Sequence, residues 1–221
     1  AGEILIDELS VYDNPAAKEK VFFIADEPYF FAHSNAVDME KYYAMVYKTF
    51  NKDEFYKLMT QFGLDAKRKI ATYSKGMKKQ LAFILGLSAR TDYLLCDETF
   101  DGLDPVMRQA IKSLLAKEMG ERGLTPVIAS HNLRELEDIC DTVGLLHKGG
   151  VLLSKDLDEM KCCIQKVQCV FKDETEYEKA AAICRIMKTE RRGSLYTLTI
   201  RGEKDETLQK FDSLETIFCE V

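Results

Sequence analysis

Short apolar runs and two stretches of helical periodicity fill the first part of the chain. The apolar runs at 3–7 and 21–25 predict strands, and residues 26–35 predict a loop. The second of two predicted helices lies between Asn51, which can cap it, and Gly63, which can end it. The apolar positions that define the two helices are Met39, Tyr42, Tyr43, Val46, Phe50, Phe55, Leu58, Met59 and Phe62.

From residue 74 onward, predicted helices and strands alternate. Each predicted strand is a continuous apolar run, which is typical of strands that are buried on both faces of a sheet. The alternation predicts an α/β fold with a mostly parallel sheet that helices cover on both sides. The predicted elements are a helix at about 76–90, a strand at 92–97, a helix at about 105–119, a strand at 125–130, a helix at 132–140, and a strand within 141–150 that ends in a glycine turn before 151–156.

The last quarter of the chain has a different pattern. Its order of elements, β-α-β-β-α-β, is that of the ferredoxin-like split βαβ unit. We place the domain boundary between residues 162 and 163, which gives domains at 1–162 and 163–221. The predicted elements of the small α+β domain are a strand at 166–171, a helix at 174–187, a hairpin at 188–202 that turns near Gly193, a helix at 204–211, and a strand at 215–221.

Composition narrows the classes of function. The chain has 221 residues, of which 46% are hydrophobic and 31% are charged, so it can bury a sizeable core. Its net charge of -6 disfavours nucleic acid as a partner, because nucleic-acid binders usually present a basic surface. The apolar run at 81–89 is too short to span a bilayer. Seven cysteines without CxxC spacing indicate reduced thiols and no zinc site.

Two adjacent acids, Asp97 and Glu98, end the predicted strand "YLLCDE". In a parallel sheet, ligands bind outside the carboxyl ends of the strands. A carboxylate at that edge can hold Mg²⁺, directly or through water, and a neighbouring carboxylate can accept a proton from water. Taken alone, such a pair is more often two solvated acids at a strand end than a functional site.

A basic helix start, "YSKGMKKQ" at 73–80, is a second candidate. Ser74 is a natural N-cap, and Gly76 allows another chain to approach the backbone closely. The free N–H groups of a first helical turn form an anion site, to which Lys75, Lys78 and Lys79 add positive potential. Alone, this stretch is better explained by an ordinary capped helix with a basic start.

Two further motifs follow predicted strands. In "FDGLDP", Gly102 permits a tight turn, Asp104 can cap the next helix, and Pro105 suits its first position. His131 comes directly after the strand at 125–130, where an imidazole can contact a terminal phosphate. Each of these features also occurs as a purely structural one.

Together, in this order, these motifs resemble the nucleotide-binding domain of ABC transporters. "YSKGM" is similar to the family signature sequence, with Lys75 where glycine or serine is common, and "YLLCDE" is similar to the Walker B strand. "GLD" resembles the D-loop, and His131 the switch histidine. The spelling "YSKGMKKQ" and the loop "DEPYF" are most similar to ATPase subunits of the multidrug and antibiotic-export type. The resemblance covers about 1–160.

The resemblance implies an N-terminally truncated P-loop NTPase-like ABC ATPase domain, with a helical subdomain at about 36–75. It implies ATP and Mg²⁺ as cofactors, with Asp97 holding Mg²⁺ through water. Glu98 would polarise the attacking water, and His131 would contact the γ-phosphate.

Family members work as dimers, which assigns further residues to a second ATP. Ser74 and Gly76 would contact the γ-phosphate bound by the partner subunit, beside the positive charge of Lys75. Asp104 would carry signals across the dimer. An integral membrane permease would be the other partner, with contacts in the helical region at 38–62. The protein would then be cytoplasmic and peripheral on the inner face of the cell membrane.

Two features depart from the family pattern. No G-x-x-x-x-G-K-[ST] motif occurs in the 221 residues, so we expect the phosphate loop to lie ahead of residue 1 and the chain to be a fragment. Asp26 stands where glutamine is usual, and an acid there can still organise Mg²⁺ through water. We expect these residues, made alone, neither to bind ATP tightly nor to hydrolyse it.

The leading interpretation is an ATP-hydrolysing subunit that drives export through a separate membrane subunit. An alternative is a soluble ABC-type ATPase that acts on ribosomes or DNA. Such proteins usually have two fused ATPase units or a long coiled-coil insertion, and the sequence shows neither. A third possibility is a non-catalytic module in which 165–221 bind a regulator or dimerise, but that segment contains no recognisable ligand motif.

Overall fold

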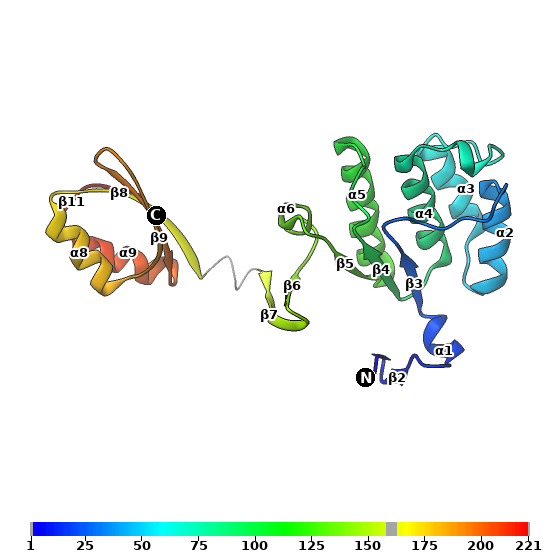
Figure 1. Cartoon of the computed structure of the whole chain (residues 1–221), viewed down its shortest axis with the longest axis horizontal. Helices are drawn as coiled ribbons and strands as arrows, with labels where there is room; N and C mark the ends of the chain where they lie inside the picture. The colour runs from blue at the N-terminus through cyan, green and yellow to red at the C-terminus, as the bar shows by residue number, and fades with distance from the viewer. Residues whose placement is uncertain (1, 158–162, 221) are drawn as a thin grey trace. The chain divides into compact units, whose positions relative to one another are not determined.

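The computed structural model describes residues 2–157 and 163–220 (Figure 1). The chain divides into two compact units, Ala1–Ile139 and Cys140–Val221. The domain boundary expected at 162/163 involves residue 162, which lies outside the described residues, and it stays a prediction. Each unit is described separately below.

A parallel sheet lies at the centre of the first unit, with strand order β3-β4-β5. In its register, Ile24 pairs with Cys96, and Cys96 pairs with Ile128. The three carboxyl ends therefore lie at one edge of the sheet, and the predicted α/β class is confirmed. The strands are β3 (Val21–Ile24), β4 (Tyr93–Asp97) and β5 (Thr125–Ala129).

Side-chain caps set the start of the main helices. Asn35, Asn51, Ser74 and Asp104 each accept a hydrogen bond from the backbone N–H three residues later. Such a cap satisfies one of the N–H groups that a helix start leaves free. The helices of this unit are α1 (Pro15–Lys18), α2 (Ala36–Val46), α3 (Lys52–Gln61), α4 (Lys75–Ala89), α5 (Pro105–Arg122) and α6 (Leu133–Leu136).

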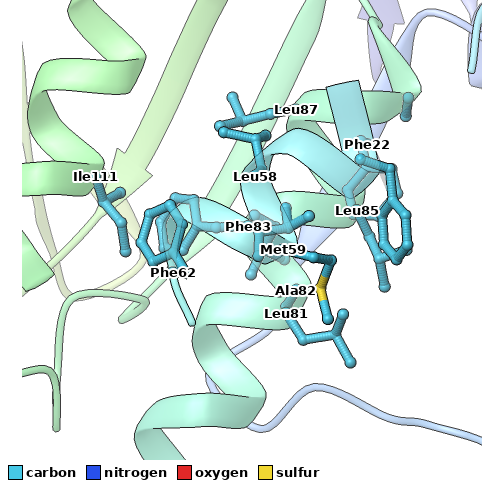
Figure 2. Close-up of a cluster of buried hydrophobic side chains, with 14 of the residues drawn as sticks. Phe22, Leu58, Met59, Phe62, Leu81, Ala82, Phe83, Leu85, Leu87 and Ile111 are labelled. Carbon is cyan, nitrogen blue, oxygen red and sulfur yellow. The ribbon is translucent and has the colours of Figure 1, made fainter. Parts of the chain in front are cut away.

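The core of the first unit forms around α4. Every residue of α4 from Lys79 to Ala89 is buried, so this helix is enclosed by its neighbours. Figure 2 shows Leu81, Phe83 and Leu87 of α4 gathered with Leu58 of α3 and with Phe62, the residue that follows α3. Burying a side chain of this size stabilises the fold by about 1.5–3 kcal/mol. α4 is therefore a fixed platform for the residues at its own start.

One face of the sheet is open within the described part of the first unit, which corrects the expectation of two covered faces. Phe22 and Ile24 point into the core, whereas Phe23 is 58% exposed. Val127, which belongs to the same face, is 52% exposed. The continuous apolar run predicted burial of both faces, but the described helices of the first unit cover only one.

Several element boundaries also differ from the predictions. The strand predicted at 3–7 is a small antiparallel hairpin, β1 (Leu5–Ile6) with β2 (Leu9–Ser10). Asp7 and Glu8 form its turn with positive φ values of 47° and 65°, which the polar–apolar pattern could not reveal. The helix predicted at 132–140 ends at Leu136.

The second unit combines a hairpin with the expected β-α-β-β-α-β arrangement. Its antiparallel sheet has the order β11-β8-β10-β9, and Val167, Leu198 and Phe211 are buried in its core. The helix predicted at 174–187 is shorter, because β9 begins at Arg185. The elements are β6 (Thr142–His147), β7 (Gly150–Asp156), β8 (Ile164–Phe171), α8 (Glu174–Ile183), β9 (Arg185–Arg192), β10 (Leu195–Arg201), α9 (Lys204–Asp212) and β11 (Thr216–Glu220).

No helix within residues 2–157 and 163–220 combines the length and apolar character that crossing a bilayer requires.

Two helical glycines test how tightly α4 packs on the sheet. A Cβ at Gly86 would lie 3.0 Å from Leu94 Cδ1 and 3.1 Å from Phe22 Cδ1, whereas a Cβ at Gly120 would meet nothing within 4 Å. We expect Gly86→Val to lower the free energy of unfolding by about 1–3 kcal/mol through overpacking. Gly120→Ala, the matched control, should raise it by about 0.5–1 kcal/mol. Urea unfolding followed by circular dichroism measures both, and a neutral Gly86→Val would contradict the packing described.

Candidate functional site

Four of the candidate residues lie at the carboxyl edge of the β3-β4-β5 sheet. Asp26 follows β3 by two residues, Asp97 is the last residue of β4, and Glu98 follows it. His131 lies two residues beyond the end of β5. The parallel register brings these positions to one edge of the sheet, as the sequence predicts.

Glu98 and His131 are in direct contact. His131 Nδ1 lies 2.8 Å from Glu98 Oε2, with side-chain exposures of 72% and 30%. The hydrogen bond to the Glu98 carboxylate, with its negative charge, raises the pKa of His131 above the ordinary 6.5. A carboxylate and an imidazole in contact are an arrangement that can hold and move a proton.

The backbone of Glu98 is in the left-handed region, with φ of 47°. Its N–H donates to Ala129 O at 2.9 Å, and its own carbonyl oxygen accepts from the Lys79 ammonium at 2.8 Å and from the Asp101 N–H at 3.2 Å. A non-glycine residue persists in this conformation only when its surroundings hold it there. These bonds therefore fix the direction in which the Glu98 side chain leaves the strand.

Oxygen-rich groups at this edge suit a hard divalent cation. One ligand atom each from Glu98, Asp101 and His131 lie within 4.8 Å of one another. Asp97, which precedes Glu98 in the sequence, is exposed and does not belong to that group. Carboxylate oxygens are the ligands that Mg²⁺ prefers, so the carboxylates of this edge fit the ion, whereas the His131 imidazole is held by Glu98. Asp101 was not among the residues predicted from sequence.

Asp26 has a buried partner that sequence reasoning missed. Its Oδ1 accepts from the Lys79 ammonium at 2.9 Å, and the Lys79 side chain is 0% exposed. The hydrogen bond and charge of Lys79 lower the pKa of Asp26 below its ordinary 3.8. A signal was present in the sequence, since Lys79 shares a helix stripe with Phe83 and Gly86 at i, i+4 and i+7.

The start of α4 forms a second group with the turn that precedes α5. Ser74 and Lys75 are exposed, and Ser74 Oγ accepts from the Met77 N–H at 3.2 Å. A Cβ at Gly76 would lie 3.5 Å from the carbonyl oxygen of Gly102. The signature-like helix start and the Gly102 turn are therefore adjacent, at an exposed helix N-terminus of the kind that can bind an anion.

Asp104 has the structural role that was expected of it. Its Oδ1 accepts from the Met107 N–H at 3.0 Å, and Pro105 is the first residue of α5. Its role in signalling between subunits remains a prediction.

An ion pair connects α5 with the segment that carries His131. Arg108 Nη1 lies 3.0 Å from Glu135 Oε1, and Arg108 Nη2 donates to Leu103 O at 3.2 Å. Glu135 also accepts from Ser130 Oγ and Asn132 Nδ2, at 3.3 and 3.1 Å. These contacts brace the residues on both sides of His131 against the D-loop-like turn.

Proteins of similar sequence are ATP-binding subunits of ABC transporters. The chain is 28% identical over 209 residues to the ABC transporter ATP-binding protein YtrB of Bacillus subtilis, covering 93% of this chain and 70% of the relative. It is 32% identical over 143 residues to the bacitracin transport ATP-binding protein BcrA of Enterococcus faecalis, covering 64% and 46%. The chain thus spans under half the length of the second relative. No family model matches it.

Solved structures give the fold. A structure of the ATP-binding subunit of an ABC transporter superposes with a TM-score of 0.66 at 23% identity, covering 73% of this chain and 69% of that one. The fold is that of an ABC ATPase domain. A post-hydrolysis dimer of an ATP-binding cassette bound to ADP and Pi gives 0.62 at 20% identity, covering 71% and 74%. The fold class predicted from sequence is therefore confirmed.

The contact between Glu98 and His131 predicts a measurable titration. We expect NMR to show a pKa of His131 above 6.5, and Glu98→Gln to lower it because the facing negative charge is lost. Because the pKa of His131 is higher in the folded state than in the unfolded state, the contact stabilises the folded state. The full stabilisation is present at pH values below the unfolded-state pKa. That stabilisation is lost as pH rises through the folded pKa.

Asp104→Asn is the matched control for this titration, because asparagine keeps the helix cap and Asp104 is not in contact with His131. The control should leave the His131 titration unchanged. An equal titration in wild type and Glu98→Gln would contradict the contact.

Proposed function

We propose that this chain is part of the ATP-binding and ATP-hydrolysing subunit of an ABC transporter, which drives transport through a separate membrane permease. The contact between Glu98 and His131 at the carboxyl edge of the sheet carries the proposal. The ABC ATPase fold and the transporter ATP-binding relatives support it. Export is the direction we propose, because a bacitracin transport protein is among the relatives.

In this proposal each residue at the sheet edge has a separate role in binding or hydrolysing ATP. Asp97 would hold Mg²⁺ through water, with Asp26 beside it, and the bound ion would supply positive charge to the phosphates. Glu98 accepts a proton from the attacking water. His131 holds Glu98 through Nδ1, which leaves Nε2 to donate to the γ-phosphate.

The start of α4 serves a second ATPase subunit. Ser74, Lys75 and Gly76 would contact an ATP held mainly by that subunit, because the exposed helix start offers N–H groups and positive charge. Residues 1–221 contain no phosphate-loop motif of their own. For these residues alone, our expectation remains weak ATP binding and no hydrolysis.

The permease would bind at an aromatic pocket beside the same site. A pocket of about 330 Å³ is lined by the loop after β3 and by α2, including Tyr29, Phe31 and Tyr42. Tyr29 is 78% exposed, and the Phe31 and Tyr42 rings meet edge to face at 4.9 Å. The loop that forms this pocket also carries Asp26, so a bound permease segment would sense the site. The subunit would then be cytoplasmic and peripheral on the inner face of the membrane.

Glu98→Gln tests the enzymatic part of the proposal. In the full-length gene product, loss of the general base should lower steady-state ATP turnover by about 10²–10⁴-fold. A coupled phosphate-release assay measures the rate, and Glu121→Gln, an exposed acid on α5, is the control that should keep it. An unchanged rate in Glu98→Gln would refute Glu98 as the base.

Tyr42→Arg tests the proposed permease contact. Replacing an aromatic anchor by a charge should reduce co-purification of a polytopic membrane protein at least about tenfold, since such anchors dominate interfaces. Tyr12→Arg is the matched control, because Tyr12 is 89% exposed and outside the pocket. Equal recovery with both variants, quantified by mass spectrometry from native membranes, would argue against this surface.

A further inference from the structure

The ammonium group of Lys79 occupies an unusual position for a lysine. Its side chain is 0% exposed, in a helix whose neighbouring residues are core. A buried charge is costly unless it is paired and hydrogen-bonded. Lys79 satisfies this requirement with the Asp26 carboxylate at 2.9 Å and the Glu98 carbonyl oxygen at 2.8 Å.

Both partners of Lys79 are residues of the proposed site. Asp26 belongs to the loop after β3, and Glu98 to the loop after β4, so one side chain from α4 connects two neighbouring strand ends. The bond to the Glu98 carbonyl also opposes rotation of a peptide that is held at a φ of 47°. The Glu98 carboxylate in turn reaches His131.

The charge of Lys79 has a second consequence. The Asp26 side chain is 45% exposed, so one carboxylate faces solvent while its charge is balanced from inside the fold. The pair contributes no net charge to a place that, in the proposed function, faces a polyphosphate. An unbalanced carboxylate there would repel phosphate and attract a divalent cation.

We propose that Lys79 is a positioning residue of this site, which neutralises Asp26 and fixes the Glu98 peptide. Its positioning of Glu98 for catalysis rests on the proposed function, whereas the charge balance at Asp26 does not. Asp26 and Lys79 together carry no net charge, because the buried ammonium and the carboxylate balance each other.

A double-mutant cycle on the 221-residue chain tests the pairing. Of the three variants in the cycle, we expect Asp26→Asn to lower the midpoint of urea unfolding most, because it leaves a buried ammonium without its counter-charge. Asp26→Asn combined with Lys79→Gln should recover at least about half of that loss, since two amides can hydrogen-bond without charge. Additive effects of the two changes would overturn the pairing.

Divalent-metal binding tests the charge balance without any ATPase assay. Using Mn²⁺ alone as the probe, followed by its electron paramagnetic resonance signal, we expect Lys79→Gln to tighten binding at least about threefold, because the Asp26 carboxylate is freed. The double variant should return to the wild-type value or weaker. Unchanged Mn²⁺ affinity in Lys79→Gln would overturn the neutralising role.

A second lysine–aspartate pair provides a matched control. Lys112 Nζ lies 3.1 Å from Asp138 Oδ2, with side-chain exposures of 9% and 71%, and neither residue contacts the sheet-edge group. Lys112→Gln should change stability but leave Mn²⁺ affinity unchanged. If Lys112→Gln changed the Mn²⁺ affinity as much as Lys79→Gln does, the effect would be a general one of net charge. That result would overturn the neutralising role of Lys79.

ATP turnover in the full-length gene product tests the positioning of Glu98. We expect Lys79→Gln to lower kcat at least about tenfold. KM for MgATP should change less, because the misplaced group is the base. Unaltered kcat would overturn the positioning role. Absence of turnover in the wild type would instead refute the proposed function, and with it the positioning of Glu98, while the Mn²⁺ and stability measurements would still decide the charge balance.

Discussion

The parallel register of β3, β4 and β5 is the constraint on which the rest of the site depends. It places the ends of three strands, distant in sequence, at one edge of the sheet. That register brings Asp26, Glu98 and His131 to the same edge of the sheet. The apolar faces of Phe22 and Leu94 hold the register, because a shift by one residue would exchange buried and exposed side chains.

Buried or half-buried ions then fix what the register brings together. Lys79 joins the loop after β3 to the Glu98 peptide, and Arg108 joins α5 to Glu135 beside His131. Lys79 is fully buried and hydrogen-bonded to both partners, as a buried charge requires, whereas Arg108 is 32% exposed. Such pairs contribute less to net stability than to geometry, because desolvation offsets much of their attraction. Lys79 thereby holds the Glu98 peptide in place, and Arg108 holds the segment beside His131.

Two helix N-caps lie at the surface of the first unit. Ser74 and Asp104 satisfy backbone N–H groups, and the close contact between Gly76 and the Gly102 turn sets the two caps side by side. The start of α4 is exposed at this place, which is the position of the anion site that we propose. The aromatic pocket that we propose for the permease is lined by the loop that also carries Asp26. Nucleotide and membrane partner would thus act on one short segment of backbone.

The sequence by itself determined the fold class, the order of most elements, the main helix caps and the motif positions Asp97, Glu98 and His131. These depend on local periodicity and on residue types with strong positional preferences. Only the tertiary structure decided that Asp26 pairs with Lys79, that Asp101 joins Glu98 and His131, and that Phe23 lies on an open face. Local pattern shows that a side chain belongs to a helix face, but which group it meets depends on the strands that pack against that face.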